Sequence, residues 1–287
     1  MKVAVYAIEL TPPKLEHLDA LLDLLHEFEI EAILFEELQS YEKVKSNYSF
    51  FTKGDALEGI EMLISLGGDG TILSTIEIIK SKSIPVLGIN TGRLGFLSHI
   101  SIKQMRPAIK QLKTGKLLIE ERSLIGIEEP HQLFETNFGL NEITVHKKDT
   151  SSMVTIHAYI EDEYFSTYWA DGLIISTPTG STGYSLSCGG PIIAPGSKTF
   201  ILTPIAPHNL NVRPLIIPDH KTIRLQFEGR TDQFLVSLDS KNTTLDAGSS
   251  IVIKKSKEKF FLASLKNHRF SQTLRDKLFW SIDKRNK

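Results

Sequence analysis

The chain has 287 residues, enough for about two domains of roughly 150 residues each. Its composition, with 41% hydrophobic and 23% charged residues, is that of a globular protein and excludes both wholesale disorder and a disulfide-stapled miniprotein. Lys and Arg number 33 and Asp and Glu 34, a net charge of −1, which excludes a global basic field that would recruit nucleic acid or an anionic membrane.

The first hundred residues alternate short apolar runs with helical periodicity, a pattern typical of βαβ units around a parallel sheet. The amphipathic stretches predict helices, with leucines at three- and four-residue spacings in the first of them. Residues 36–57 are charged and weakly patterned, and they predict either a helix or a mobile loop. We therefore expect a Rossmann-like α/β domain over residues 1–100, with strands at 3–8, 32–35, 62–66 and 86–89 and helices at 15–28 and 71–80.

From about residue 120 onward the pattern changes to short runs with period-two alternation, separated by turn residues. This predicts an all-β, sandwich-like domain over residues 101–267. Its expected strands are 154–160, 173–176, 223–227, 234–238, 251–254 and 260–263. Apolar residues at four-residue steps, Phe270, Leu274, Leu278 and Ile282, then predict a last helix. We expect this segment, residues 268–287, to pack on the first domain.

The first candidate site is the sharp turn Gly67-Gly68-Asp69-Gly70-Thr71, where a buried strand meets the start of a helix. The amides and dipole of a helix N-terminus attract phosphate, and glycines let the backbone approach phosphate oxygens closely. A carboxylate here can accept a proton from a hydroxyl or help to hold a divalent metal ion. The alternative is a tight turn in which Asp69 or Thr71 caps the helix. The motif alone leaves both open.

The second candidate is the stretch from Asp171 to Pro191, in which six Ser or Thr hydroxyls fall between residues 176 and 185. Such a stretch suits a sugar and a base, although segments of this composition are commonly solvated loops. The dipeptide Asn141-Glu142 is a third candidate, because a carboxylate beside an amide can bond adjacent ribose hydroxyls.

Several other classes are excluded by inspection. The chain has no Walker-type triphosphate motif, no Rossmann glycine fingerprint and no nucleophile elbow. Cys188 with His208 can be imagined as nucleophile and base, but a small buried thiol is the more common case. The single cysteine also fits a reducing cytoplasm. No metal-ligand spacing appears among the nine histidines, so we expect no metal site built from the chain itself. No window reaches the roughly 18 apolar residues of a membrane span.

Four motifs taken together, in collinear order, resemble the NAD kinase family, particularly its bacterial members. They are GGDGT at 67–71, NTGRLGFL at 90–97, Asn141-Glu142 and DGLIISTPTGSTGYSLSCGGPI at 171–192. Supporting segments are TPIAPH at 203–208, RPLIIP at 213–218 and LRDKLFW at 274–280. The first motif alone is less specific, because diacylglycerol and sphingosine kinases and phosphofructokinases carry a similar turn, but those relatives lack the rest.

The resemblance implies an α/β domain, a β-rich domain and a last helix that returns to the first. It also implies transfer of the γ-phosphoryl group of ATP to the 2′-hydroxyl of the adenosine ribose of NAD, with Mg²⁺ as the counterion of ATP. An alcohol is a poor nucleophile at neutral pH, so a carboxylate that accepts its proton is chemically reasonable. The expected partners are NAD and ATP, and a homodimer or homotetramer is expected.

Site residues follow by matching motifs. Asp69 matches the family's catalytic aspartate, and with Gly70 it is expected against the reacting end of NAD. Asn141 and Glu142 are expected to hold ribose and adenine edges. The remainder of the NAD pocket is expected to be Asp171, Thr182, Gly183, Tyr184, Ser185, Leu186 and Ser187. Some family members place the counterparts of Phe96, Ala206 and Lys241 near the ligand.

The chain departs from the family pattern at four positions. Gly183 stands where Ala is usual, Lys241 where Gln is common, and Ser74 and Trp169 where basic residues are often found. These departures leave open the phosphate donor, ATP or polyphosphate, and the fine contacts to nicotinamide. The sequence also leaves open whether NADH is accepted and whether NADP or NADPH regulates the chain by feedback. Two rival functions also stay open: a lipid or sugar kinase that shares the glycine turn, and a non-catalytic NAD(P)-binding sensor.

Overall fold

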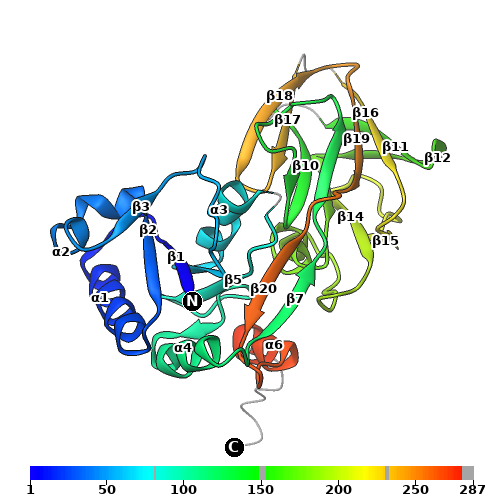
Figure 1. Cartoon of the computed structure of the whole chain (residues 1–287). Coiled ribbons are helices and arrows are strands. Elements are labelled where there is room, and N and C mark those ends of the chain that lie inside the picture. The colour runs from blue at the N-terminus through cyan, green and yellow to red at the C-terminus, as the bar shows by residue number, and fades with distance from the viewer. Residues whose placement is uncertain (81, 149–152, 230–232, 280–287) are drawn as a thin grey trace, which may run out of the picture. The chain divides into compact units, whose positions relative to one another are not determined.

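The computed structural model describes residues 1–80, 82–148, 153–229 and 233–279 (Figure 1). Contacts within the chain divide it into two compact units. Unit 1 contains Met1–Glu121 and Phe260–Lys287, and unit 2 contains Arg122–Lys259. The sequence placed the divisions at 100/101 and 267/268. Among the described residues, no helix has both the length and the apolar character needed to cross a bilayer.

In the described part of the chain, unit 1 is built on an eight-stranded sheet in the order β3-β2-β1-β4-β5-β20-β7, with β6 paired to β5 off this path. Neighbours from β3 to β5 pair in parallel, and so do β5 and β20. Every residue of β4 and β5 is buried, as expected for parallel strands covered on both faces. The strands are β1 (Lys2–Tyr6), β2 (Glu31–Phe35), β3 (Ser49–Phe51), β4 (Met62–Leu66), β5 (Val86–Asn90), β6 (Ile100–Ser101), β7 (Leu118–Arg122) and β20 (Phe260–Ser264).

Helices cover both faces of this sheet. Apolar residues of α1 (Pro12–Glu27) and α4 (Met105–Lys113) share one hydrophobic cluster with β1, β4 and β5, so these two helices lie on one face (Figure 1). Helix α3 (Asp69–Ile79) lies on the other face, where Gly88 leaves room for it: a Cβ at Gly88 would lie 2.4 Å from Ile72 Cδ1. Helix α6 (Phe270–Leu278) belongs to unit 1, which confirms the returning last helix; Ile282 lies outside the described residues.

Three segments of unit 1 differ from the sequence expectation. Residues 101–121, expected within the all-β domain, belong to unit 1 and contain helix α4 and most of strand β7. Residues 36–57 contain a 3₁₀ turn, Glu36–Ser40, the short helix α2 (Glu42–Lys45) and strand β3, which is too short and too exposed for period-two alternation to reveal it. The segment expected as a strand of the second domain, 260–263, instead pairs as β20 with β5. Its continuous run Phe-Phe-Leu-Ala is typical of a strand buried on both faces in a parallel sheet.

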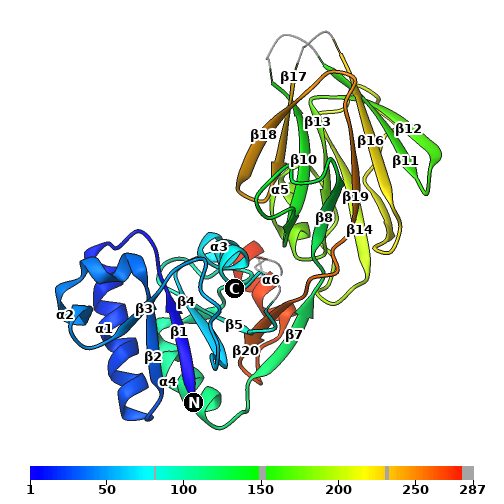
Figure 2. The same cartoon turned by 45° about the horizontal axis from the view of Figure 1, so that its top comes forward.

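Within the described residues, unit 2 consists of two six-stranded antiparallel sheets, which confirms the sandwich-like β domain (Figure 2). The orders are β15-β14-β13-β10-β17-β18 and β12-β11-β16-β19-β8-β9. Alternate residues of both sheets, such as Val145 and Leu225, form one apolar core. The strands are β8 (Ile125–Glu129), β9 (Phe138–Gly139), β10 (Glu142–Lys147), β11 (Val154–Ile160), β12 (Glu163–Ala170), β13 (Gly172–Ser176), β14 (Thr199–Ile205), β15 (Leu215–Pro218), β16 (Ile223–Glu228), β17 (Gln233–Leu238), β18 (Lys241–Asp246) and β19 (Ser250–Lys255).

The hydroxyl-rich segment follows β13, the strand that pairs with β10. Glu142 at the start of β10 lies opposite Ser176 at the end of β13. After β13 the chain makes a 3₁₀ turn, Gly180–Thr182, and the short helix α5 (Tyr184–Ser187) before β14. The topology of unit 2 thus brings two of the sequence candidates, Asn141-Glu142 and the hydroxyl-rich segment, to one end of one sheet.

Candidate active site

Asp69 is the first residue of α3, directly after the Gly67-Gly68 turn that ends β4. Its carboxylate accepts three backbone N–H groups from one segment: Oδ2 accepts Phe96 N at 2.8 Å, and Oδ1 accepts Leu97 N at 3.0 Å and Ser98 N at 2.8 Å. A Cβ at Gly95 would lie 1.8 Å from Asp69 Oδ1, so only glycine permits this approach. The carboxylate therefore holds the 95–98 segment rather than capping its own helix.

The 95–98 segment is also held by Asn90, at the end of β5. Asn90 Nδ2 donates to Ser98 O at 3.0 Å, and Asn90 Oδ1 accepts Gly92 N at 2.8 Å. Ser98 Oγ donates to Gly67 O at 2.9 Å, which ties the segment to the glycine turn itself. No role of Asn90, Gly95 or Ser98 is predicted from the sequence. Their position within or directly after the conspicuous Asn90–Leu97 motif was the available signal.

The other candidates of unit 1 lie close to this turn. Gly70 is exposed in the first turn of α3, and its carbonyl accepts Ser74 Oγ at 3.1 Å. Phe96 is half-buried, and Lys277 Nζ of α6 lies 4.8 Å from the centroid of its ring. A helix N-terminus with exposed glycines and one engaged carboxylate is suited to phosphate oxygens and to an incoming hydroxyl.

A second carboxylate clamp lies in unit 2. Asp239, in the turn between β17 and β18, accepts Leu140 N at 2.7 Å on Oδ2, and Asn141 N at 2.8 Å and Glu142 N at 3.1 Å on Oδ1. Its own backbone is left-handed, with φ of 51°, and its N–H donates to Glu142 O at 3.0 Å. Through these bonds Asp239 fixes the backbone of the Asn141-Glu142 candidate. This role is not apparent from the sequence, because an aspartate after a predicted strand indicates only a turn.

The carboxyl group of Glu142 is unusual in its surroundings. Its Oε2 atom is buried and, among the described residues, has no hydrogen-bond partner. Burial, together with the nearby negative charge of Asp239, raises the pKa of Glu142 to about 8. A Cβ at Gly183 would lie 3.2 Å from Oε2, so the glycine leaves the space beside this oxygen open.

The hydroxyl-rich segment is mostly internal scaffold. Thr177 Oγ1 donates to Leu140 O at 2.5 Å, and its N–H donates to Asn141 O at 2.9 Å, so this residue fixes the same dipeptide from the other side. Ser181 Oγ donates to Pro178 O at 2.6 Å and accepts Ile193 N at 3.0 Å. Ser185 is buried and its Oγ lies 2.8 Å from Thr203 Oγ1. These hydroxyls order the loop; Thr182 and Ser187 are the more accessible ones.

The remaining candidates of unit 2 surround α5. Asp171 Oδ1 lies 2.5 Å from Lys147 Nζ, and the exposed Tyr184 ring stacks on His146 with centroids 5.7 Å apart. Burial lowers the pKa of His146, so its imidazole tends to be neutral. Leu186 is half-buried.

The last three residues singled out in the sequence are Ala206, Lys241 and Cys188. Ala206 is exposed in the left-handed region, with φ of 44°. Lys241 Nζ donates to Thr136 O at 2.6 Å and lies 5.7 Å from the Phe134 ring. Cys188 is half-buried and burial raises the pKa of its thiol, which disfavours a nucleophilic thiolate.

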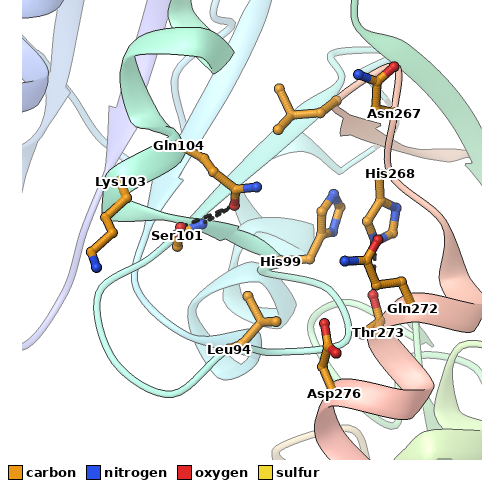
Figure 3. Close-up of a pocket in the computed structure, with 11 residues that line it drawn as sticks. Leu94, His99, Ser101, Lys103, Gln104, Asn267, His268, Gln272, Thr273 and Asp276 are labelled. Carbon is orange, nitrogen blue, oxygen red and sulfur yellow. Dashed lines mark hydrogen bonds between the residues drawn. The ribbon is translucent and has the colours of Figure 1, made fainter.

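A pocket of about 620 Å³ lies within unit 1, against α6 (Figure 3). The imidazoles of His99 and His268 stack along it with ring centroids 3.7 Å apart, and His268 Nε2 lies 2.9 Å from Thr273 Oγ1. Its lining includes Leu94 and His99, which flank the segment that Asp69 holds. Among the described residues, the site residues predicted from the sequence lie outside this lining. Across the part of the chain that the structure describes, no group of three or more His, Cys, Asp or Glu is placed to hold a metal ion.

Two family models match the chain. The model described as the ATP-NAD kinase N-terminal domain matches residues 22–117, and the ATP-NAD kinase C-terminal domain matches residues 140–265. The NAD kinase of Flavobacterium johnsoniae is 45% identical and that of Christiangramia forsetii 42% identical, each over 100% of both chains.

Two solved structures share the fold. The crystal structure of an NAD kinase from Archaeoglobus fulgidus in complex with ATP is 26% identical, covers 97% of this chain and 99% of its own, and has a TM-score of 0.76. Yeast NADH kinase complexed with NADH has a TM-score of 0.86, covering 99% of this chain and 89% of its own, at 24% identity.

Proposed function

The chain belongs to the ATP-NAD kinase family, and on that premise we propose which of its residues bind the substrates and which carry the reaction. The chain is an ATP-dependent NAD kinase, which transfers the γ-phosphoryl group of ATP to the 2′-hydroxyl of the adenosine ribose of NAD and yields NADP and ADP. The observation that carries this function is the full-length identity to bacterial NAD kinases.

Asp69 is the proposed proton acceptor for the 2′-hydroxyl. Its Oδ1 accepts two N–H groups, whereas Oδ2 accepts one, which leaves Oδ2 the more available oxygen for an alcohol proton. The three backbone bonds fix the carboxylate in orientation, as a general base requires. Phosphate oxygens of the substrates are expected near the glycine turn and the N-terminus of α3, with Gly70 and Phe96 beside them.

Magnesium is proposed to enter with the donor, as MgATP, and so as part of a substrate. When bound, it would neutralise charge on the phosphates during transfer. The chain's own part is then to orient the acceptor hydroxyl and to take its proton.

In unit 2 we assign the ribose and adenine edges of NAD to Asn141 and Glu142. Support comes from the unpartnered, buried Glu142 Oε2 and from the open space that Gly183 leaves beside it. The other proposed NAD contacts are Asp171, Thr182, Gly183, Tyr184, Ser185, Leu186 and Ser187, with Ala206 and Lys241 as weaker members. Of these, Ser185 would act mainly by holding the loop, because its hydroxyl is bonded to Thr203.

A homodimer or homotetramer is also proposed. It is supported by β12, an edge strand of its sheet that exposes aromatic side chains of Tyr164, Phe165 and Trp169 at 56%, 44% and 52%. Long edge strands with exposed apolar side chains favour pairing with a further chain. Light scattering at micromolar concentration tests this, and a monomer would contradict it. A cytoplasmic location is proposed from the single cysteine, and fractionation of cells tests it.

The function is tested by a matrix of donors and acceptors. ATP and polyphosphate are each combined with NAD, NADH, diacylglycerol and a sugar phosphate. NADP is measured with an NADP-specific dehydrogenase, the other phosphorylated products by mass spectrometry, and ADP release in the mixtures that contain ATP. We expect NADP from ATP and NAD. If the lipid or the sugar phosphate is phosphorylated and NAD is not, the result would favour a lipid or sugar kinase. If NAD binds and is not turned over, the result would favour a non-catalytic sensor.

A further inference from the structure

Two acidic side chains meet at the proposed ribose-binding segment, and they are held in different ways. Asp239 receives three backbone N–H groups, distributed over both of its oxygens. Glu142 has a buried Oε2 without a hydrogen-bond partner among the described residues. An ionised carboxylate is stabilised by N–H donors, whereas a buried carboxylate without them is costly. Of the two, Asp239 is therefore the group that carries the negative charge.

The groups that face Glu142 support this division. Asp239, in the turn between β17 and β18, presents a negative charge to Glu142. Gly183, between the 3₁₀ turn and α5, also faces Glu142 and brings no charge. The residue directly before its strand is Asn141, whose side chain is a neutral amide. The Lys241 ammonium donates to Thr136 O, and its charge lowers the pKa of Asp239 rather than that of Glu142. Burial also raises the pKa of Asp239, and the three N–H donors and Lys241 offset only part of that rise. Glu142 has no such donors on Oε2, so the geometry still places the negative charge on Asp239.

A ribose diol binds better to the ionised form of Glu142 than to the neutral form. Each ribose hydroxyl that binds a carboxylate donates a hydrogen bond, and an ionised carboxylate can accept from both with its two oxygens. A neutral carboxylic acid has one good acceptor and one donor of its own. The diol therefore binds better when Glu142 has lost its proton, and its hydroxyls supply the donors that Oε2 lacks in the unbound protein.

We propose that Asp239 is a positioning residue for NAD, whose carboxylate fixes the backbone of residues 140–142 and, together with the burial of Glu142, keeps that side chain neutral, so that NAD binding releases one proton from Glu142. This rests on the proposed function, because it takes the Glu142 segment as the ribose site. It assigns Asp239 no contact with substrate.

The size of the effect follows from the pKa of about 8. At pH 7 about 0.9 of the free protein carries the proton on Glu142, and at pH 9 about 0.1 does. NAD binding is then expected to release about 0.9 proton at pH 7 and about 0.1 at pH 9. Only about a tenth of the protein is competent at pH 7, so the dissociation constant for NAD is about tenfold larger there than at pH 9.

Titration calorimetry of the full chain with NAD alone tests this. At pH 7 the measured enthalpy is compared in phosphate, HEPES and Tris, and at pH 9 in borate, CHES and Tris. The buffers at each pH differ in ionisation enthalpy, and the slope of binding enthalpy against ionisation enthalpy gives the number of protons released. We expect a slope near 0.9 at pH 7 that falls toward zero at pH 9. Binding of NAD at pH 7 with the same enthalpy in all three buffers would overturn the proposal, while leaving the kinase function intact.

Three variants assign the proton. Glu142→Gln cannot release it, so its enthalpy is expected to be independent of buffer, and a persisting slope would overturn the role of Glu142. Asp239→Asn keeps Glu142 but removes the neighbouring charge, so the midpoint of proton release is expected to fall by about one pH unit. An unchanged midpoint in a folded Asp239→Asn protein would overturn the role of Asp239. Asp246→Asn, an exposed carboxylate of the same hairpin, is the matched control and is expected to behave as wild type.

A different result would reach further. If the folded wild-type protein binds no NAD, either alone or in the presence of ATP, the result would contradict the proposed function itself. Proton release and catalysis are thus separate readouts, and failure of one is distinguishable from failure of the other.

Discussion

Replacement of Asp69 by Asn removes one charge and one acceptor from a fixed position while it preserves the shape of the side chain. In the native protein both carboxylate oxygens accept backbone N–H groups of residues 96–98. An amide offers one oxygen, so at least one of these N–H groups faces an NH₂ group instead. A buried donor without a partner costs about 1–3 kcal/mol, which corresponds to a lowered melting temperature of roughly 2–10 °C.

The effect on turnover is expected to be much larger. An amide cannot accept the proton of the 2′-hydroxyl, and loss of a general base reduces turnover by about 100-fold or more. Binding of NAD is expected to stay within several-fold, because the ribose and adenine edges are assigned to Asn141 and Glu142. The assay is NADP formation at saturating ATP, with NAD varied to separate kcat from KM.

The matched control is Asp55→Asn, because Asp55 is an exposed carboxylate of the same unit that accepts Thr52 N at 2.7 Å. We expect it to retain full turnover. A near-normal kcat for Asp69→Asn would remove Asp69 from the proton-transfer role. A drop in kcat that vanishes when the 95–98 segment is restabilised by a second substitution would leave Asp69 as a structural anchor only.

Further predictions concern unit 2. A Cβ at Gly180 would lie 2.2 Å from the carbonyl oxygen of Asn141, a backbone atom that cannot move aside easily. Gly180→Ala is therefore expected to lower the free energy of unfolding by about 1–3 kcal/mol and to weaken NAD binding at least tenfold. In Gly183→Ala the Cβ would lie 3.2 Å from the side-chain oxygen Glu142 Oε2, and we expect the KM for NAD to change less than fivefold. Calorimetric unfolding and NAD kinetics compare the two, and equal effects would refute the geometry. Because the pKa of Glu142 is raised from 4.5 to about 8, its burial reduces stability progressively as pH rises between these values. Glu142→Gln should therefore raise the melting temperature relative to wild type more at pH 8 than at pH 5, and a constant difference would contradict the raised pKa.

The fold was largely predictable because its signals are local. Buried parallel strands such as β4 and β5 are continuous apolar runs, and α1 carries a leucine stripe. Strand β20 was misassigned because its place beside β5, more than 150 residues away in sequence, is decided by packing and not by any local pattern. Strand β3 was missed because three residues carry no usable periodicity.

The candidate site was predictable only in part. Asp69, Asn141 and Glu142 stood out because charged or amide residues interrupted apolar runs or glycine turns. Their partners did not: Asp239 reaches the Asn141-Glu142 segment across about 100 residues of sequence. Ser98 and Gly95 matter through backbone bonds and close approach to Asp69, which side-chain chemistry does not reveal. The hydroxyls of Thr177, Ser181 and Ser185 look like ligand groups in sequence but are bonded within the loop.

The most direct measurement is the position of the new phosphate in the product formed from NAD and ATP. Phosphorus NMR and mass spectrometry of the purified dinucleotide, with ADP measured in parallel, give both position and stoichiometry. We expect one phosphomonoester on the 2′-oxygen of the adenosine ribose for each ADP released. Phosphate on another oxygen, or ADP released without a phosphorylated dinucleotide, would contradict the assignment of this chain as an NAD kinase.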